Sequence, residues 1–531
     1  MRRRRPAARG RPPLALTAAA VASVALVLLP LGYLLLRAGT GGADAWEVLG
    51  REGTLRLVVD TVLLVGAVVA AAVAVGVPLA WLVTRTDLPG ARAWAVAGAL
   101  PLVIPSYVAA LALLGAFGPR GLLQELLGRT FGVERLPEIY GFPGAFLALT
   151  LSTYPYVFLL VAASLRGLDP ALEEASRGLG RTPWQTFARV TLPALRPAIG
   201  AGSLLVALYV LADFGAVSLM QYDALTRAIY LQYRALFDRD PAAVLALVLV
   251  ALTAVVLALE SRSRRGGAFH RATPGTARPP ARVALGRWRW PAIGFCGALV
   301  GLFLVVPLTV LVYWTVRGEQ AVEFPWAAAF RSVGVSALAA AVAAVAVLPL
   351  AFLAGRWRRP WTVALERSAY ASNALPGIVI ALALVFFGAR YGGVLYQTLA
   401  LLVFAYVVRF FPQALAGASS ALRAVNPRVE EAARGLGHRP ASVFARVTVP
   451  LIAPGMLAGA ALVFLSTMKE LPATLLLRPI GFETLATEIW KYTSLASYSR
   501  AAPPALLLVL VSAPLVYALT ARRGGELGPP G

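Results

Sequence analysis

The sequence predicts an all-α, polytopic membrane protein, and three observations carry this prediction. The chain of 531 residues is 59% hydrophobic and has a mean hydropathy of +0.73, which is more apolar than a soluble core requires. About twelve apolar runs are each long enough to cross a bilayer as a helix. The second half of the chain also repeats the first in register. We therefore expect about 12 transmembrane helices in two parallel six-helix repeats.

The apolar runs give the expected spans in order. A helix satisfies its own backbone hydrogen bonds in lipid, and about 20 residues cross the hydrocarbon core. The first six runs lie near residues 14–36, 58–84, 94–117, 143–165, 198–220 and 241–260. The other six lie near 292–315, 332–354, 368–388, 396–421, 455–477 and 503–520. The first run follows four arginines at 2–5 but is longer than the core of a signal peptide, so we interpret it as a retained span.

The distribution of charge predicts that both termini are cytoplasmic. With the N-terminus inside, cytoplasmic segments hold roughly twice as many Lys and Arg residues as external ones, as the positive-inside rule requires. We expect a first half at 1–260, a cytoplasmic linker rich in Arg, Gly and Pro at 261–290, and a second half at 291–531. The net charge of +24 is spread between apolar runs, so membrane topology explains it better than a nucleic-acid partner. The partner is the lipid bilayer of the inner, or cytoplasmic, membrane.

The polar inventory excludes several kinds of site. Cys296 lies in an apolar run, and His270 and His438 lie in Arg-rich polar stretches, so we predict no metal site. A nucleotide-binding P-loop needs a glycine-rich backbone and a lysine that reaches the phosphates. Lys469 and Lys491, which are the only lysines in the sequence, lack that context. The chain is therefore predicted to be no enzyme and to bind no cofactor.

The repeat is clearest in one cytoplasmic loop of each half, at 169–197 and 426–454. A shift of about 257 residues aligns the two loops without gaps. Asp169-Pro170 and Asn426-Pro427 fit a helix N-cap followed by a proline in the first turn. Gly180 and Gly437 are placed to end each helix. Each loop is expected to hold a short helix, a sharp turn and a second amphipathic segment that leads into the next span.

These loops resemble the EAA loop of ATP-binding-cassette (ABC) importer permeases. Both read Glu-Glu-Ala-x-Arg-Gly-Leu-Gly, with a proline thirteen residues after the last glycine. The matching residues are Glu173, Glu174, Ala175, Gly178, Gly180, Phe187 and Pro193 in the first loop, and Glu430, Glu431, Ala432, Gly435, Gly437, Phe444 and Pro450 in the second. In that family a coupling helix docks on the ATPase subunit. A single copy would also fit an ordinary interfacial loop, whereas two copies in register favour coupling.

The resemblance implies a fold, partners and a mechanism. It implies the MetI-like fold of type I ABC importer permeases, with alternating access driven from outside the chain. It also implies an ATPase homodimer on the cytoplasmic side, which holds ATP and Mg, and an extracytoplasmic substrate-binding protein. A twelve-span secondary transporter is the alternative from a different class, but it leaves the paired loops unexplained.

Two acids inside the predicted spans are candidate pathway residues. Asp213 and Glu470 lie at matching places, beside the helix-weakening residues Gly215 and Pro472. An ionisable group in a span needs a partner or a cavity, so each is a functional hypothesis. The alternative is a structural ion pair with Lys469 or Arg409.

Prolines mark two further candidate positions on the pathway. Pro105 lies in the third predicted span and Pro376 in the ninth, where a proline kinks a helix. Both residues are candidates to line the pathway, although kinks that serve only packing are the alternative.

The segments around both acids are similar to those of fused ferric-iron permeases. They are 211–223 with 226–230 in the first half, and 466–474 in the second. This similarity implies Fe(III) as substrate, and a hard cation suits the oxygen ligands present. Permeases for thiamine, phosphonate or polyamine remain alternatives.

Overall fold

A computed structural model describes residues 12–40, 46–119, 121–132, 136–234, 239–263, 282–317 and 324–524. Nearly all of these residues are helical, and within them the only strand-like pairing is an isolated bridge between Thr86 and Val283. Among the described residues, eleven helices are long and apolar enough to cross a membrane, or up to twelve if a bent pair counts as one span. The all-α, polytopic prediction is confirmed.

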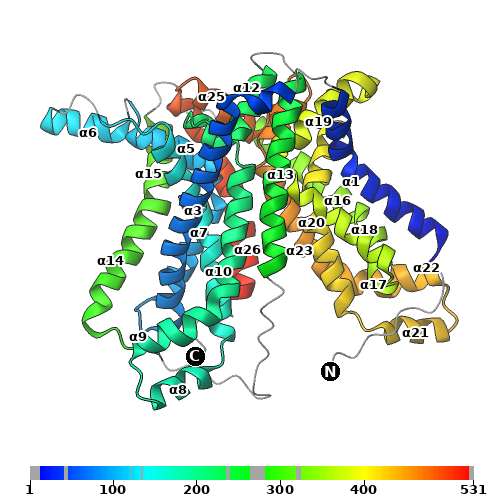
Figure 1. Ribbon diagram of the computed structural model, residues 1–531, viewed down its shortest axis with the longest axis horizontal. Helices are drawn as coiled ribbons and strands as arrows, with labels where there is room; N and C mark the ends of the chain where they lie inside the picture. The colour runs from blue at the N-terminus through cyan, green and yellow to red at the C-terminus, as the bar shows by residue number, and fades with distance from the viewer. Residues whose placement is uncertain are drawn as a thin grey trace. The chain divides into compact units, whose positions relative to one another are not determined.

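The first repeat runs from α1 to α13 (Figure 1). Its helices are α1 (Leu14–Thr40), α3 (Glu52–Arg85), α4 (Ala91–Ala99), α5 (Ser106–Phe117), α6 (Leu122–Phe131), α7 (Phe142–Gly167), α8 (Pro170–Gly178), α9 (Pro183–Thr186), α10 (Leu192–Ala212), α11 (Gly215–Leu219), α12 (Leu225–Arg234) and α13 (Arg239–Ser263). Short 3-10 helices lie at Val48–Gly50 and Leu100–Val103, and a π-helical turn lies at Phe187–Thr191.

The second repeat runs from α14 to α26. Its helices are α14 (Arg289–Val300), α15 (Val306–Val316), α16 (Trp326–Ala346), α17 (Leu348–Arg356), α18 (Pro360–Tyr370), α19 (Gly377–Tyr391), α20 (Leu399–Ala424), α21 (Pro427–Gly435), α22 (Pro440–Val443), α23 (Val449–Met468), α24 (Pro472–Leu477), α25 (Leu485–Ser494) and α26 (Tyr498–Gly524). A π-helical turn at Gly301–Val305 joins α14 to α15, and another lies at Phe444–Thr448.

Four of the predicted spans are broken rather than continuous. The run at 94–117 divides at Pro105 into α4 and α5, and the run at 368–388 divides at Pro376. The helices on the two sides of Pro376 are bent by 99°. The runs at 198–220 and 455–477 break after Ala212 and Met468. Proline at these points removes a backbone donor, and glycine weakens the helix. The length of an apolar run takes no account of these backbone effects, so it did not reveal the breaks.

The helices form two compact units whose membership crosses the repeat boundary. Unit 1 comprises the described parts of Met1–Trp46, Asp238–Leu247 and Pro325–Glu488. Unit 2 comprises those of Glu47–Phe237, Val248–Phe324 and Ile489–Gly531. The first helix of each repeat therefore packs with the central helices of the other repeat.

Polar and aromatic contacts hold α1 within unit 1. The Ser23 hydroxyl donates to the carbonyl oxygen of Ala346 at 3.1 Å. The Tyr33 ring meets the edge of Phe387, with 5.7 Å between ring centroids. Near the end of α1, Arg37 forms an ion pair with Asp240 of α13 at 2.7 Å. These contacts fix a helix whose sequence belongs to the first repeat onto α16 and α19 of the second.

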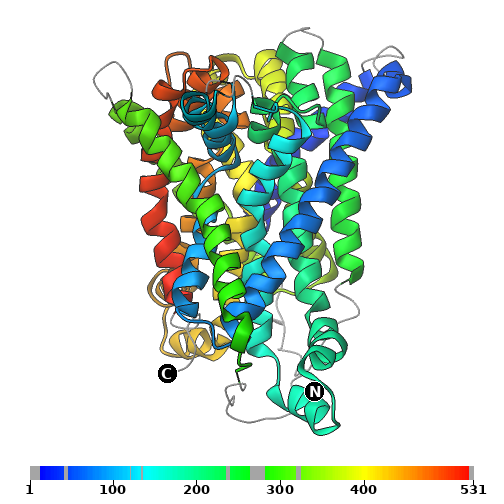
Figure 2. The same ribbon diagram turned by 90° about the vertical axis from the view of Figure 1, so that its left-hand side faces the viewer.

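The corresponding helix of the second repeat, α15, is held within unit 2. It runs beside α26, as the light-green and red helices in Figure 2 show. The Trp314 indole donates to the carbonyl oxygen of Gly115 on α5 at 3.0 Å. The Tyr313 hydroxyl donates to Glu125 of α6 at 3.0 Å, and both terminal nitrogens of Arg317 bond the same carboxylate.

Several sequence predictions fall on residues outside those described. These are the arginines at 2–5, His270 and most of the linker, at 264–281. The end of the linker is described, and it pairs with unit 2. The Val283 N–H donates to Arg85 O at 2.8 Å, and the Leu285 N–H donates to the Asp87 carboxylate at 2.8 Å.

The close approach of α15 to Gly115 generates a stability prediction. A side-chain carbon at Gly115 would lie 2.9 Å from Trp314 Nε1 and 3.0 Å from a Val310 methyl. We expect Gly115→Leu to destabilise the protein by about 1–3 kcal/mol, because overpacking forces α15 away from α5. The measurement is the thermal unfolding midpoint of the purified protein in detergent micelles.

Gly66→Leu is the matched control for this prediction. Gly66 lies inside α3, and a side-chain carbon there would meet nothing within 4 Å. Leucine favours the helix over glycine by up to about 1 kcal/mol, so the control should unfold at the same temperature or higher. Equal unfolding midpoints for the two variants would contradict the close packing of α15.

Candidate functional site: paired loops and broken spans

Each of the two loops, at 169–197 and 426–454, begins as its residues predict. Asp169 caps α8 by accepting a hydrogen bond from the Ala171 N–H, and Asn426 caps α21 by accepting one from the Arg428 N–H. Both short helices then end in a sharp turn, where Gly180 has a φ of 79° and Gly437 a φ of 84°. Glycine adopts this left-handed conformation without strain. The short helix and the turn therefore have the same geometry in both repeats.

The first glutamate of each loop points inward and holds the short helix in place. Glu173 lies 3.6 Å from the Arg85 guanidinium at the end of α3 and accepts a 2.8 Å hydrogen bond from the Thr191 hydroxyl. Glu430 makes the equivalent two contacts, an ion pair to Arg356 and a 2.8 Å hydrogen bond from Thr448. We call these two contacts of the glutamate, with an arginine and a threonine, a clasp. The second glutamates, Glu174 and Glu431, are exposed.

An aromatic contact supports each clasp one helical turn away. Phe187 packs against Trp81 of α3, with ring centroids 5.9 Å apart, and Phe444 packs against Phe352 of α17, at 5.4 Å. Trp81 and Arg85, like Phe352 and Arg356, are four residues apart and so lie on one face of their helix. Each loop is therefore fixed to one helix face by a charged contact and an aromatic contact.

The same five residues, Phe-Ala-Arg-Val-Thr, form a π-helical turn in both loops. In the first, the Leu192 N–H bonds Phe187 O, and in the second the Val449 N–H bonds Phe444 O. Pro193 and Pro450 follow at once, so the π-turn carries the helix past a residue that has no backbone donor. Trp184–Ala212 and Phe444–Met468 are consequently continuous helices of 29 and 25 residues. Pro193 and Pro450 therefore lie at the entry to each span without interrupting the helix.

Apolar side chains project from both loops. Leu179 is 79% exposed and Leu436 80% exposed, each just before the turn glycine. Trp184 of the first loop is 73% exposed. Isolated exposed apolar residues are common, and here Leu179 and Leu436 occupy the same place in the two loops.

The predicted pathway acids lie at the helix breaks. Asp213 follows the end of α10, and its carboxylate accepts hydrogen bonds from the Ser106 hydroxyl and from the Ala216 and Val217 N–H groups. Glu470 follows the end of α23 and accepts from the Ala473 N–H at 3.2 Å. Each acid therefore caps the short helix after the break, either α11 or α24.

The broken third span packs on the broken fifth span in each repeat. In unit 2, Ser106, which directly follows Pro105, donates to Asp213. In unit 1, a side-chain carbon at Gly377, which directly follows Pro376, would lie 2.5 Å from Glu470 Oε1. The structure thus brings the residue after Pro105 to Asp213 and the residue after Pro376 to Glu470. Ser106 and Gly377 are small residues that permit this approach, and sequence reasoning missed both.

The two breaks differ in charge. Glu470 Oε2 lies 3.4 Å from the Nε of Arg409 on α20. An ion pair with Arg409 is one of the two structural alternatives that the sequence analysis named for these acids. In the described part of the chain no basic side chain forms an ion pair with Asp213. The side chains gathered around Glu470 are mainly hydroxyl-bearing: Ser332, Ser336, Tyr406, Thr467, Thr474 and Thr484.

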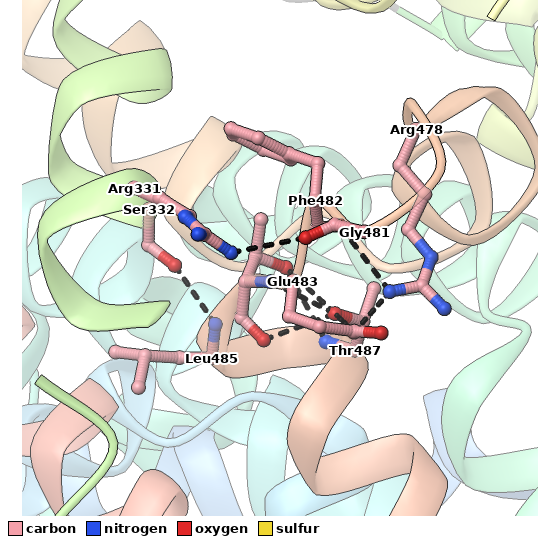
Figure 3. Close-up of polar contacts among 9 residues, drawn as sticks. Arg331, Ser332, Arg478, Gly481, Phe482, Glu483, Leu485 and Thr487 are labelled. Carbon is pink, nitrogen blue, oxygen red and sulfur yellow. Dashed lines mark hydrogen bonds and ion pairs between the residues drawn. The ribbon is translucent and has the colours of Figure 1, made fainter. Parts of the chain in front are cut away.

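The loop after α24 is anchored on α16 in unit 1 (Figure 3). Arg331 donates to Gly481 O at 3.1 Å, and the Ser332 hydroxyl accepts from the Leu485 N–H at 2.8 Å. Arg478 pairs with Glu483, which also accepts from the Thr487 hydroxyl. In the first repeat the Thr61 hydroxyl of α3 accepts from the Leu225 N–H in the same manner, at 3.1 Å. Leu225 and Leu485 are therefore equivalent residues.

Comparison with known proteins matches the chain to one family over most of its length. The family described as "Binding-protein-dependent transport system inner membrane component" matches residues 76–262 and again 347–522. The "Fe(3+)-transport system permease protein FbpB 2" of Haemophilus influenzae is 35% identical over 96% of this chain and 98% of its own length.

Two further relatives match smaller parts. The "Ferric transport system permease protein FbpB" of Actinobacillus pleuropneumoniae is 24% identical over 71% of this chain and 58% of its own length. The "Molybdenum transport system permease protein ModB" of Escherichia coli is 36% identical over 22% of this chain and half of its own length. With its family domain matched twice and both copies of the loop in place, this chain belongs to the binding-protein-dependent transport system inner-membrane components, the permeases of ABC importers, in a fused two-copy form.

Proposed function

We propose that this permease imports Fe(III) delivered by an extracytoplasmic binding protein. The observation that carries the proposal is the similarity to a ferric permease over almost the whole of both chains. The molybdenum relative matches only 22% of this chain, so it supports the family rather than a substrate. The chain offers carboxylate, phenol and hydroxyl oxygens, which a hard cation prefers over nitrogen or sulfur. Fe(III) is the cargo here and not a resident cofactor.

The energy for transport comes from a separate ATPase homodimer that holds ATP and Mg. The twin loops offer it two equivalent docking surfaces, each with an exposed leucine at a turn and a clasped glutamate behind it. Both loops and both termini then face the cytoplasm of a cell whose inner membrane holds the permease. The chain itself needs no cofactor under this proposal.

Motion passes from each loop to a break through one continuous helix. The helix of 29 residues that begins at Trp184 ends one residue before Asp213, and its counterpart of 25 residues ends at Met468. We call each of these two helices, Trp184–Ala212 and Phe444–Met468, a lever. A helix rises about 1.5 Å per residue, so the two ends of each lever are tens of ångströms apart. Closure of the ATPase dimer would tilt both levers as rigid bodies and move the breaks. Asp213, Glu470, Pro105 and Pro376 then act at the moving end of the pathway.

The substrate assignment is tested by uptake into proteoliposomes that contain the permease, its ATPase and its binding protein. We expect radiolabelled Fe(III) to accumulate inside the proteoliposomes only when ATP is present inside them. The interior then corresponds to the cytoplasm. Excess unlabelled Fe(III) should compete, whereas thiamine, molybdate, phosphonate and spermidine should not. Competition by thiamine would move the assignment to its nearest rival, and uptake driven by an ion gradient without ATP would favour a secondary transporter.

The docking surfaces are tested by placing a charge on each loop. Leu179→Asp together with Leu436→Asp should lower ATPase binding by about tenfold or more, since burying one leucine contributes about 1.5–3 kcal/mol. Both side chains are largely exposed, so the permease should still fold. The measurement is co-purification of the ATPase with the permease from membranes.

Val394→Asp is the control, because Val394 is 92% exposed and lies outside both loops. It should leave ATPase binding unchanged. The docking proposal fails if the double variant retains the ATPase as fully as the control does.

The capping acids are tested by neutral substitutions. We expect Asp213→Ala with Glu470→Ala to slow uptake about tenfold, because the loss of each cap costs about 1 kcal/mol. ATPase binding should be unchanged, since both residues lie at the far end of the levers. Asp223→Asn, a neutral change at an exposed carboxylate nearby, should transport normally. Loss of assembled complex in the double variant would instead favour purely structural roles.

A further inference from the structure

The helices α12 and α25 occupy equivalent places in the two repeats. Each has ten residues and begins with a leucine whose N–H is bound by a hydroxyl from the second span, Thr61 or Ser332. The fifth residue of each is a fully buried isoleucine, Ile229 or Ile489. The sixth is aromatic in both helices: Tyr230 in one and Trp490 in the other.

These two equivalent aromatic residues touch each other within unit 2. The centroids of the Tyr230 and Trp490 rings lie 6.2 Å apart with the planes at 80°. Phe214 packs on both, with centroids 4.8 Å from Tyr230 and 5.1 Å from Trp490. Edge and tilted contacts at these separations are favourable for aromatic rings.

Contact between equivalent residues has a geometric meaning. When a rotation relates two copies, a residue can meet its own equivalent only beside the rotation axis. A route that two parallel repeats enclose follows the same axis. The contact between Tyr230 and Trp490 is therefore expected beside such an axis. The 21 residues of α10 begin within the first loop and end directly before Asp213, which corresponds to about 30 Å of helix.

Phe214 is also coupled to the moving end of the lever. It directly follows Asp213, whose carboxylate caps α11, and the Thr226 hydroxyl of α12 donates to Asp213 O at 2.6 Å. A tilt of α10 would therefore carry Phe214 and α12 together, and with them Tyr230. Trp490 lies on α25, whose first residue, Leu485, is bound by Ser332 of α16 and not by α10, so the same tilt would separate Trp490 from both rings.

We propose that Phe214, Tyr230 and Trp490 form an aromatic seal that closes the transport route at the end opposite the coupling loops and parts when the ATPase dimer closes. The inference rests on the proposed import function. It assigns to this chain three specific residues that block the passage of solute in the resting state.

Cysteine crosslinking across the seal tests its movement. In a Cys296→Ser background, Tyr230→Cys with Trp490→Cys should be joined by a short bis-thiosulfonate reagent in the absence of ATP. The crosslink should reduce ATP-driven Fe(III) uptake by about tenfold or more, and a reductant should restore it. Vanadate trapping of the ATPase dimer should lower the yield of crosslink.

The matched control pair is Glu125→Cys with Arg317→Cys, which joins α6 to α15 across a contact that the proposal leaves unchanged. Its crosslink should form equally with and without vanadate and should leave uptake largely intact. Equal behaviour of the two pairs would overturn the seal.

A leak assay tests the seal without the ATPase. Trp490→Ala removes two ring contacts, so the permease alone in liposomes should release a small entrapped ion about tenfold faster than wild type. Trp490→Tyr, which copies the first repeat, should stay tight. A Trp490→Ala variant as tight as wild type would contradict the seal. Absence of ATP-driven uptake by the wild-type complex would contradict the proposed function instead, and the leak assay would still decide the seal.

Discussion

The clasp around one glutamate in each of the paired loops is the contact on which the rest of the arrangement depends. Glu173 and Glu430 each meet an arginine at the C-terminal end of the second span and a threonine in the π-turn. Removing one partner of a buried ion pair destabilises a protein by about 3–5 kcal/mol, because the remaining charge stays desolvated. The clasp thus turns a short, otherwise marginal helix of nine residues into a rigid extension of the membrane helices. Each loop is thereby fixed to the end of its second span.

The clasp acts over distance because no joint separates it from the break. The π-turn absorbs the proline that would otherwise interrupt the helix, so Trp184–Ala212 and Phe444–Met468 are single rods. At their far ends, Asp213 and Glu470 cap short helices that could not hold their own first turns. Each helix is rigid at the loop end and is followed by a capped break at its other end. Any bending of the fifth span is therefore expected at the break, where the third and fifth spans meet. The aromatic contact of Phe214 with Tyr230 and Trp490 lies directly beside that point.

Duplication preserved this geometry while the chemistry of the two copies diverged. Ser176 and Thr186 share a buried hydrogen bond of 3.0 Å in the first loop, and Ala433 and Val443 fill the same places without one. Replacing both partners of a hydrogen bond with apolar groups of the same shape is nearly neutral. At the breaks, Arg409 neutralises Glu470 whereas Asp213 has only neutral donors among the described residues. Exchange of the first helices, α1 and α15, between the compact units ties the two copies into one protein.

The sequence alone determined that the chain is helical, that it crosses a membrane about twelve times, and that it carries two copies of one capped loop, because apolar length, N-cap chemistry and internal repetition are local signals. It also placed Asp213 and Glu470 beside helix breaks, since glycine and proline act on their own backbone. Only the tertiary structure decided which helix each glutamate meets, that Ser106 and Gly377 bring the broken spans together, that α1 and α15 exchange units, and that Tyr230 meets Trp490. Those outcomes join residues far apart in the chain, and their energies depend on packing that no window of neighbouring residues contains.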